Sequence, residues 1–224
     1  MKGICYIISA CCKKECRAIK KGTSDIIIAA DKGYEVLLRN GIEPDMVLGD
    51  FDSLKYVPNH KNTIVHPAKK DATDTFLSVE KGFDLGFRNF VILGGIGGKR
   101  IDHTIANMQT LVHIAKNGGR GALLGQGTVM TAIHNGRAEL PEKKRGFVSV
   151  FCMSDRALNV NLHSLKYELN DAALLSSNPL GVSNEFIGKT DAYASVEKGD
   201  LLITWHEKAE KILSDEKYLS LFQL

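Results

Sequence analysis

The 224-residue sequence has no apolar run long enough to cross a membrane, no internal repeat and no low-complexity segment. Its apolar stretch near the start, residues 4–12, follows a single lysine and precedes Lys13, Lys14 and Glu15 instead of the small residues of a cleavage site. We therefore interpret this stretch as a buried first strand, and we expect neither a secretory signal nor a membrane partner.

The five cysteines form no recognisable metal-binding or disulfide pattern. Cys11, Cys12 and Cys16 lie close together in the sequence, but no second cluster completes a zinc pattern, and the histidines are scattered. An odd number of cysteines without such a pattern is typical of reduced thiols, which predicts a cytoplasmic protein.

The charges are nearly balanced, with 29 Lys and Arg against 26 Asp and Glu, and the net charge of +3 is too small to indicate nucleic-acid binding. The balance nevertheless changes along the chain. Residues 1–130 hold 18 basic and 13 acidic side chains, whereas residues 131–224 hold 11 and 13. Together with an ordinary hydrophobic content of 44%, this asymmetry indicates a globular chain with two segments of different character.

Residues 1–128 alternate short apolar runs with amphipathic stretches, which predicts a mostly parallel, Rossmann-like α/β sheet. Continuous runs of Ile, Val and Leu indicate strands that are buried on both faces. We expect one helix to start near Asp71 or Thr73, and another to start near Thr104, to carry Ile105 on its apolar face and to end at Gly118. The expected strands are residues 4–8, 25–30, 46–48, 63–65, 90–93 and 122–124.

Residues 129–224 have a different pattern, with short strand-like runs separated by turn signals such as Asn135-Gly136. This pattern predicts an all-β second domain, a sandwich or a barrel, and we place the domain boundary between residues 128 and 129. A helical period returns only in the tail, at residues 209–221. The expected strands are residues 129–133, 147–151, 158–162, 191–196 and 201–205.

Aspartates follow four of the predicted parallel strands. Because the carboxyl ends of parallel strands gather at one edge of an open α/β sheet, we expect these four loops to bring their carboxylates together. If the segment is extended, Asp50 and Asp52 point the same way, whereas Asp45 beside Pro44 is interpreted as a turn residue. The residues in these loops are Asp31 in the first, Asp50 and Asp52 in the second, Asp71, Thr73 and Asp74 in the third, and Asp102 in the fourth.

So many carboxylates repel one another unless a cation neutralises them. Hard oxygen ligands of this kind suit Mg²⁺, which bridges to substrate phosphates. A single aspartate after a strand is more often a helix cap or a turn former. Four such loops in one sheet nevertheless favour a metal–phosphate site.

A glycine-rich loop follows the strand expected at residues 90–93. Its glycines let the backbone approach a ligand closely, and Lys99 and Arg100 add positive charge suited to phosphate oxygens. His103 follows, in a position to contact phosphate, to orient Asp102, or only to pack at a helix start. The loop matches neither a Walker motif nor a dinucleotide turn, and its glycines could simply form a tight turn. The glycines are Gly94, Gly95, Gly97 and Gly98.

Taken together, these motifs resemble those of the thiamine pyrophosphokinase family. The resemblance extends over nearly the whole chain, in the order of the family. It rests on Ala-Asp-Lys-Gly at 30–33, Pro-Asp-Met-Val-Leu-Gly-Asp-Phe-Asp-Ser at 44–53, Lys-Asp-Ala-Thr-Asp at 70–74, the loop at 94–103, and Gly-Val-Ser-Asn-Glu-Phe at 181–186.

The resemblance implies an α/β catalytic domain followed by a β-sandwich domain, in a homodimer whose active sites lie between subunits. It implies transfer of a pyrophosphoryl group from the co-substrate ATP to the hydroxyl of thiamine, which leaves AMP. By the same resemblance, Asp50, Asp52, Thr73 and Asp74 would organise Mg²⁺ and phosphate. The further residues carried over are Asp31, Asp71 and Asp102 in the acidic site, Gly97, Lys99, Arg100 and His103 around ATP, and Ser183 and Asn184 at thiamine.

Two functions from other classes are compatible with the same motifs. A metal-dependent nucleotide phosphohydrolase could use the aspartates, with Asp102 and His103, to activate water. A non-catalytic protein that binds thiamine or a nucleotide would keep the pockets without turnover. Within the kinase hypothesis, Asp74 and Asp102 are equal candidates for the general base.

Overall fold

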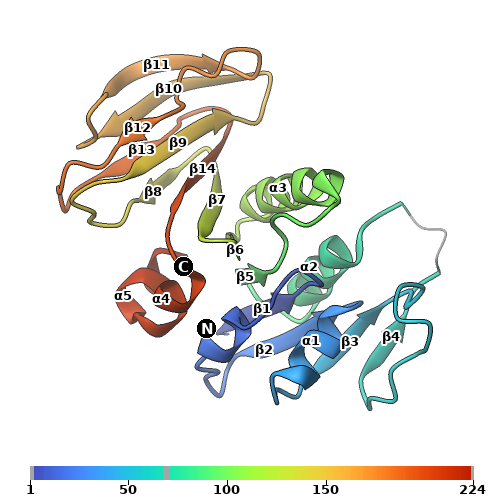
Figure 1. Cartoon of the computed structure of the whole chain (residues 1–224). Coiled ribbons are helices and arrows are strands. Elements are labelled where there is room, and N and C mark those ends of the chain that lie inside the picture. The colour runs from blue at the N-terminus through green and yellow to red at the C-terminus, as the bar shows by residue number, and fades with distance from the viewer. Residues whose placement is uncertain (1–2, 68–70, 223–224) are drawn as a thin grey trace.

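The computed structural model describes residues 3–67 and 71–222, so Lys70 of the motif at 70–74 lies outside the described residues. Its largest feature is a mixed ten-stranded sheet with the order β12-β9-β14-β7-β6-β5-β1-β2-β3-β4 (Figure 1). A second, four-stranded antiparallel sheet has the order β11-β10-β13-β8. Within the described residues, no helix combines the length and the apolar character needed to cross a bilayer.

Six neighbouring strands of the large sheet are parallel, and each overlaps a strand expected from the sequence. Their side chains alternate between two cores: Tyr6 and Ile8 point into one, whereas Cys5 and Ile7 point into the other. This two-sided burial explains why the strands read as continuous apolar runs. The strands are β1 (Ile4–Ile8), β2 (Ile26–Ala30), β3 (Met46–Gly49), β4 (Thr63–Val65), β5 (Asn89–Leu93) and β6 (Arg120–Gly125).

The direction of chain travel reverses at β1. From β1 the chain adds β2, β3 and β4 on one side, and it then returns to add β5 and β6 on the other side. The order of the strands therefore reverses between β1 and β5, and ligands of open α/β sheets bind at the carboxyl edge beside such a point. The topology alone thus indicates where a ligand would bind.

Three helices belong to this part: α1 (Gly33–Arg39), α2 (Asp74–Asp84) and α3 (Ile101–Lys116). Helix α1 was not predicted, and α3 begins three residues earlier than expected, because Ile101 lies before the periodic apolar stripe and is 69% exposed. Ile105 is also exposed, contrary to expectation, whereas Leu111 faces the core. The earlier start puts Asp102 and His103 in the first turn of α3.

Helix α2 begins where the sequence predicts, because the hydroxyl oxygen of Thr73 accepts a hydrogen bond of 3.2 Å from the backbone N–H of Phe76. We expect Thr73→Ala to lower the free energy of unfolding by about 1 kcal/mol, and Thr73→Ser to retain most of the capping energy. Urea unfolding of both variants checks this prediction. Equal losses for the two substitutions would show that the hydroxyl does not stabilise the helix.

The antiparallel strands of the second half continue the large sheet and face the small one. Val150 and Ile203 of the large sheet belong to the same core as Val160 and Leu162 of the small sheet, as a sandwich requires. The strands β8, β11 and β12 were not predicted. The bounds are β7 (Thr128–His134), β9 (Phe147–Cys152), β12 (Asn184–Glu185) and β14 (Asp200–His206) in the large sheet, and β8 (Arg137–Glu139), β10 (Arg156–His163), β11 (Leu169–Leu175) and β13 (Tyr193–Ser195) in the small one.

One hydrogen-bonded sheet runs through both halves, which the sequence analysis did not foresee. Strands β6 and β7 pair in an antiparallel hairpin, and the proposed boundary between residues 128 and 129 falls at the start of β7, inside one sheet. Buried Asp200 of β14 strengthens the connection, because it contacts His134 of β7 at 2.7 Å and Lys116 of α3 at 3.0 Å. The division at residue 128 stays a prediction.

The tail forms short helices instead of the single helix expected at residues 209–221. The break is at Asp215, whose backbone is extended and whose carboxylate accepts a hydrogen bond from the N–H of Lys217. These helices pack back on the first half of the chain (Figure 1): α4 contacts the 3₁₀ helix η1 (Glu15–Ala18), and η2 contacts β5 and β6. They are α4 (Ala209–Ser214), α5 (Glu216–Leu219) and the 3₁₀ helix η2 (Ser220–Phe222).

Candidate active site

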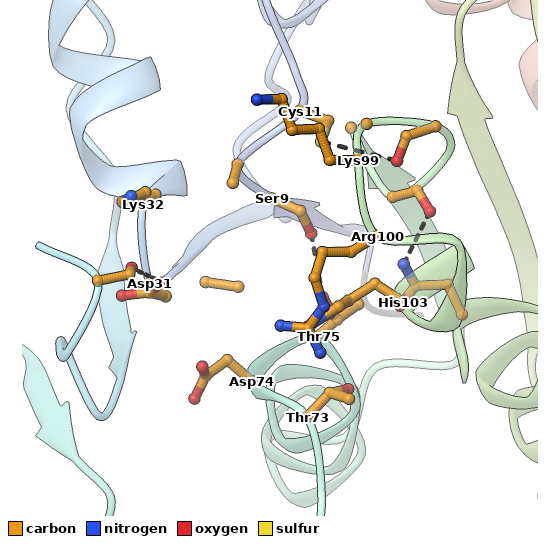
Figure 2. Close-up of a pocket in the computed structure, with 18 of the residues that line it drawn as sticks. Ser9, Cys11, Asp31, Lys32, Thr73, Asp74, Thr75, Lys99, Arg100 and His103 are labelled. Carbon is orange, nitrogen blue, oxygen red and sulfur yellow. Dashed lines mark hydrogen bonds between the residues drawn. The ribbon is translucent and has the colours of Figure 1, made fainter. Parts of the chain in front are cut away.

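A pocket of about 420 Å³ lies at the carboxyl edge of the sheet, where the loops after β1, β2, β3 and β5 meet the start of α2 and α3 (Figure 2). An adjoining pocket of about 510 Å³ shares Asp50, Thr73 and Asp74 with it. Every catalytic and phosphate-binding residue predicted from the sequence lines at least one of these pockets. They are Asp31, Asp50, Asp52, Thr73, Asp74, Gly97, Lys99, Arg100 and His103 in the first pocket, and Asp71 and Asp102 in the second.

Two glycines allow the walls of the pocket to approach each other closely. A Cβ atom on Gly94 would lie 2.0 Å from the backbone nitrogen of Cys12, and one on Gly33 would lie 1.8 Å from the carbonyl oxygen of Ile8. Neither position can hold a side chain without moving backbone. The segment after β2 is therefore pressed against the end of β1, and the loop after β5 is pressed against the loop that follows β1.

The glycine-rich loop is fixed onto helix α3. The N–H of Gly97 donates to the hydroxyl of Thr104 at 3.1 Å, and the side-chain amide of Asn107 donates to the carbonyl of Gly95 at 2.8 Å. The N–H of Gly94 is also used, because it donates to the carbonyl of Leu124. The backbone N–H groups of Gly94 and Gly97 are thus engaged within the chain, whereas the sequence analysis expected the loop to leave its N–H groups available.

Asp31 shows the features of a ligand-binding carboxylate. Its backbone is left-handed, with φ at +47°, which is uncommon for a residue other than glycine. One carboxylate oxygen accepts a hydrogen bond from Ser53, but the other, Oδ1, is buried and has no partner in the structure. A buried carboxylate oxygen without a partner is costly, so this atom is suited to a ligand or a cation that brings the missing contact.

Asp50 and Asp52 both line the pocket, but not through strand alternation as expected. Buried Phe51 between them has a left-handed backbone, with φ at +60°, so the segment is not extended. The N–H of Asp52 instead donates to a carboxylate oxygen of Asp50 at 3.1 Å. The two carboxylates reach the same pocket from a tight turn.

Arg100 and Asp102 form a bidentate ion pair at the N-terminus of α3. The guanidinium Nε lies 3.1 Å from each carboxylate oxygen of Asp102, and a second nitrogen also donates to that carboxylate. This hydrogen bonding lowers the pKa of the Asp102 carboxyl and raises the pKa of the Arg100 guanidinium. Asp102 is therefore a weak base that holds Arg100 in place.

Magnesium fits this donor set only in part. Among residues 3–67 and 71–222, no three His, Cys, Asp or Glu side chains lie together in a group that could hold a metal ion. The carboxylates of Asp50, Asp52 and Asp74 instead fit a Mg²⁺ ion that takes one or two of them together with substrate phosphates and water.

Three further residues from the sequence motifs lie elsewhere. Asn184 begins β12, on the outer edge of the large sheet, and Ser183 directly precedes it; neither lines these two pockets in its own chain. The buried amide of Asn184 bonds both the N–H and the carbonyl of Tyr167, at 3.0 and 2.6 Å. Asp45 is a turn residue at the opposite end of β3, as interpreted, where it pairs with Lys21 at 2.6 Å.

The sequence analysis missed several pocket residues. Ser53 could have been found, because it belongs to the same motif as Asp50 and Asp52. Lys32 belongs to the Ala-Asp-Lys-Gly motif, which predicts a role only for its aspartate, and Asn107 has no signal beyond being polar on a helix. The missed lining residues are Ser9, Cys11, Lys32, Ser53, Thr75 and Asn107.

Comparison with known proteins shows two family matches along the chain. Residues 20–121 match the family "Thiamin pyrophosphokinase, catalytic domain", and residues 137–200 match "Thiamin pyrophosphokinase, vitamin B1 binding domain". The thiamine pyrophosphokinase of Bacillus subtilis is 27% identical over 183 residues, which span 79% of this chain and 85% of that protein.

Two solved structures of thiamine pyrophosphokinases share the fold of this chain. The crystal structure of thiamine pyrophosphokinase from Bacillus subtilis superimposes with a TM-score of 0.78 at 24% identity, covering 91% of this chain and 98% of that chain. Yeast thiamin pyrophosphokinase gives a TM-score of 0.74 at 17% identity, covering 95% and 88%.

Proposed function

The chain belongs to the thiamin pyrophosphokinase family, and from that premise we propose that it transfers the pyrophosphoryl group of ATP to the hydroxyl of thiamine, giving thiamine diphosphate and AMP. The observation that carries this proposal is the pocket at the carboxyl edge, where carboxylates from three loops face Lys99 and Arg100. Such a mixture suits a polyphosphate that is bridged by a cation.

In this proposal the phosphates lie between the glycine-rich loop and the acidic wall. Lys99 and Arg100 neutralise phosphate oxygens, and Asp102 keeps the Arg100 guanidinium in place. Asp50, Asp52, Thr73 and Asp74 are the proposed ligands of Mg²⁺, which when bound would neutralise the polyphosphate and stabilise the departing oxygen of AMP.

The reaction requires little covalent chemistry from the protein. The hydroxyl oxygen of thiamine forms a bond to the β-phosphorus of ATP, the bond from that phosphorus to the α–β bridging oxygen breaks, and AMP leaves with the electron pair. Most of the rate enhancement then comes from alignment and charge neutralisation. We favour Asp74 over Asp102 as acceptor of the hydroxyl proton, because the pairing of Asp102 with Arg100 lowers its pKa.

Thiamine would be bound with the help of a second subunit. Ser183 and Asn184 are the proposed contacts of its aminopyrimidine, yet they lie away from the pocket of their own chain. Large apolar side chains are exposed on and around the same edge, at β9 and the loops beside β12. An exposed apolar patch of this kind is typical of an interface. They are Phe147, Tyr167, Leu180, Val182 and Ile187.

We therefore expect a homodimer in which this edge of one subunit reaches the pocket of the other. Light scattering should give twice the 24.6 kDa mass of the chain. Phe147→Lys places a charge in the proposed interface and should yield monomer with at least tenfold less activity. Val57→Lys is the matched control, because Val57 is about as exposed but lies outside the patch. A monomeric wild type with full activity would refute the shared site.

The coupled formation of AMP tests the reaction itself. Purified protein with ATP, Mg²⁺ and thiamine should release AMP and thiamine diphosphate in equal amounts. Formation of ADP and thiamine monophosphate would refute pyrophosphoryl transfer. Phosphate release without an alcohol acceptor would favour the phosphohydrolase, and thiamine binding without AMP would favour a binding protein.

The proposed location is the cytoplasm. All five cysteines are free thiols in the structure, including exposed Cys11 at the pocket. A reducing compartment would preserve these thiols.

A further inference from the structure

Lys32 is a pocket residue to which the reaction proposed above assigns no role. It lies directly after Asp31, at the N-cap of α1, and its side chain lines the pocket while remaining exposed. Figure 2 shows Lys32 beside Asp31 on one wall, with Lys99 beside Cys11 across the pocket. The two lysines thus approach the same space from the loops after β2 and β5.

The pocket leaves both of these ammonium groups available. Among the residues that the structure describes, neither Lys32 nor Lys99 forms an ion pair, whereas the third cation of the lining, Arg100, is held by Asp102. An unpaired lysine on a surface is commonly only solvated. Lys32 differs because it lies inside a concave site whose opposite wall presents another unpaired lysine.

The backbone beneath Lys32 is held from two sides. The N–H of Asp31 donates to the carbonyl of Leu48 at the end of β3, at 2.8 Å. On the other side, Gly33 is so close to the carbonyl of Ile8 that a Cβ atom would lie 1.8 Å from it. The position of the Lys32 Cα is therefore fixed relative to β1 and β3, which limits the region that its ammonium group can reach to the mouth of the pocket.

We propose that Lys32 is a specificity-determining residue that binds the polyphosphate of the nucleotide from the wall opposite Lys99. The inference rests on the proposed function in taking a nucleoside triphosphate as the ligand. A lysine ammonium binds phosphate oxygens as a compact charge with three donors. With cations on both walls, the pocket distinguishes a nucleoside triphosphate from a monophosphate, which favours entry of ATP over retention of AMP.

Calorimetric titration of the purified protein with ATP and with AMP, without thiamine, tests the proposal. Lys32→Met removes the charge and keeps the length of the side chain, whereas Lys32→Arg keeps the charge. Lys61→Met is the matched control, since Lys61 is exposed in the loop between β3 and β4 and lines neither site pocket. We expect Lys32→Met to raise the Kd of ATP about tenfold and that of AMP less than twofold.

The other variants and the other possible results also support or overturn the role of Lys32. Lys32→Arg should restore ATP binding to within about threefold of wild type, and Lys61→Met should change nothing. Equal losses for ATP and AMP would place Lys32 at the ribose or base, and no loss for either would leave it solvated; both results overturn the proposal. Because Lys32 is exposed, melting curves of the variants should coincide with wild type.

The measurement separates this inference from the proposed reaction. If the protein binds ATP but makes no AMP with thiamine, the proposed reaction fails, while the ratio of ATP and AMP affinities still decides the role of Lys32. If the protein makes AMP and the ratio does not change in Lys32→Met, the reaction stands and the inference fails. If wild type does not bind ATP, the inference is overturned together with the proposed function.

Discussion

Asp74→Asn is expected to reduce AMP formation at least about a thousandfold while leaving the fold intact. Asp74 lines both adjoining pockets, as do Asp50 and Arg100. The substitution removes a proposed Mg²⁺ ligand and the favoured proton acceptor, and each loss alone costs two or more orders of magnitude. The amide keeps the shape of the side chain, so the helix loses only the charge at its N-terminus, about 0.3–1 kcal/mol.

The matched control for this prediction is Asp84→Asn, at the other end of the same helix. Asp84 is exposed and lines neither pocket, so turnover should match wild type. Titration of Asp74→Asn with ATP, with and without Mg²⁺, separates the two roles: a metal ligand loses the Mg²⁺-dependent part of the affinity, whereas a pure base keeps it. More than a tenth of wild-type turnover in Asp74→Asn would remove Asp74 from the reaction.

The location of the site could be predicted because it depends on strand direction more than on side-chain detail. Buried parallel strands are recognisable as continuous apolar runs, and residues that follow them must appear at one edge. Asp31, Asp50, Asp74 and Asp102 were placed at one site by this argument alone, and the structure does bring them to two adjoining pockets. The cap at Thr73 was also predictable, because capping depends on a few neighbouring residues.

Features that depend on long-range packing could not be predicted in the same way. Phe51 is buried and has a left-handed backbone, and no local sequence pattern signals this conformation. The continuous sheet depends on pairing between β6 and β7, which looks like an ordinary hairpin in the sequence. The N–H of Gly97 is used by Thr104, seven residues later, once α3 packs beside the loop.

Gly94→Ala is expected to be among the most destabilising single-methyl changes in the pocket, at about 2–5 kcal/mol. Gly94 has φ at +77°, and its new Cβ atom would lie 2.0 Å from the nitrogen and 2.6 Å from the Cα of Cys12. The left-handed backbone alone costs about 1–2 kcal/mol for alanine, and displacing packed atoms adds about 1–3 kcal/mol. Because total stability is typically about 5–15 kcal/mol, urea unfolding should show a much earlier midpoint.

Gly118→Ala separates the steric effect from the backbone effect. Gly118 also has a left-handed backbone, with φ at +70°, but a Cβ atom there would meet nothing within 4 Å. It should therefore lose only about 1–2 kcal/mol. The difference between the two variants measures how tightly the loop after β5 is pressed against the loop that follows β1. In Gly94→Ala the new methyl group should also push apart the loops after β1 and β5. Because both loops line the pocket, we expect the KM for ATP to rise in Gly94→Ala and not in Gly118→Ala. Equal losses of stability in the two variants would mean that the loops after β1 and β5 move apart at no cost. The close contact between Gly94 and Cys12 would then not shape the proposed nucleotide site.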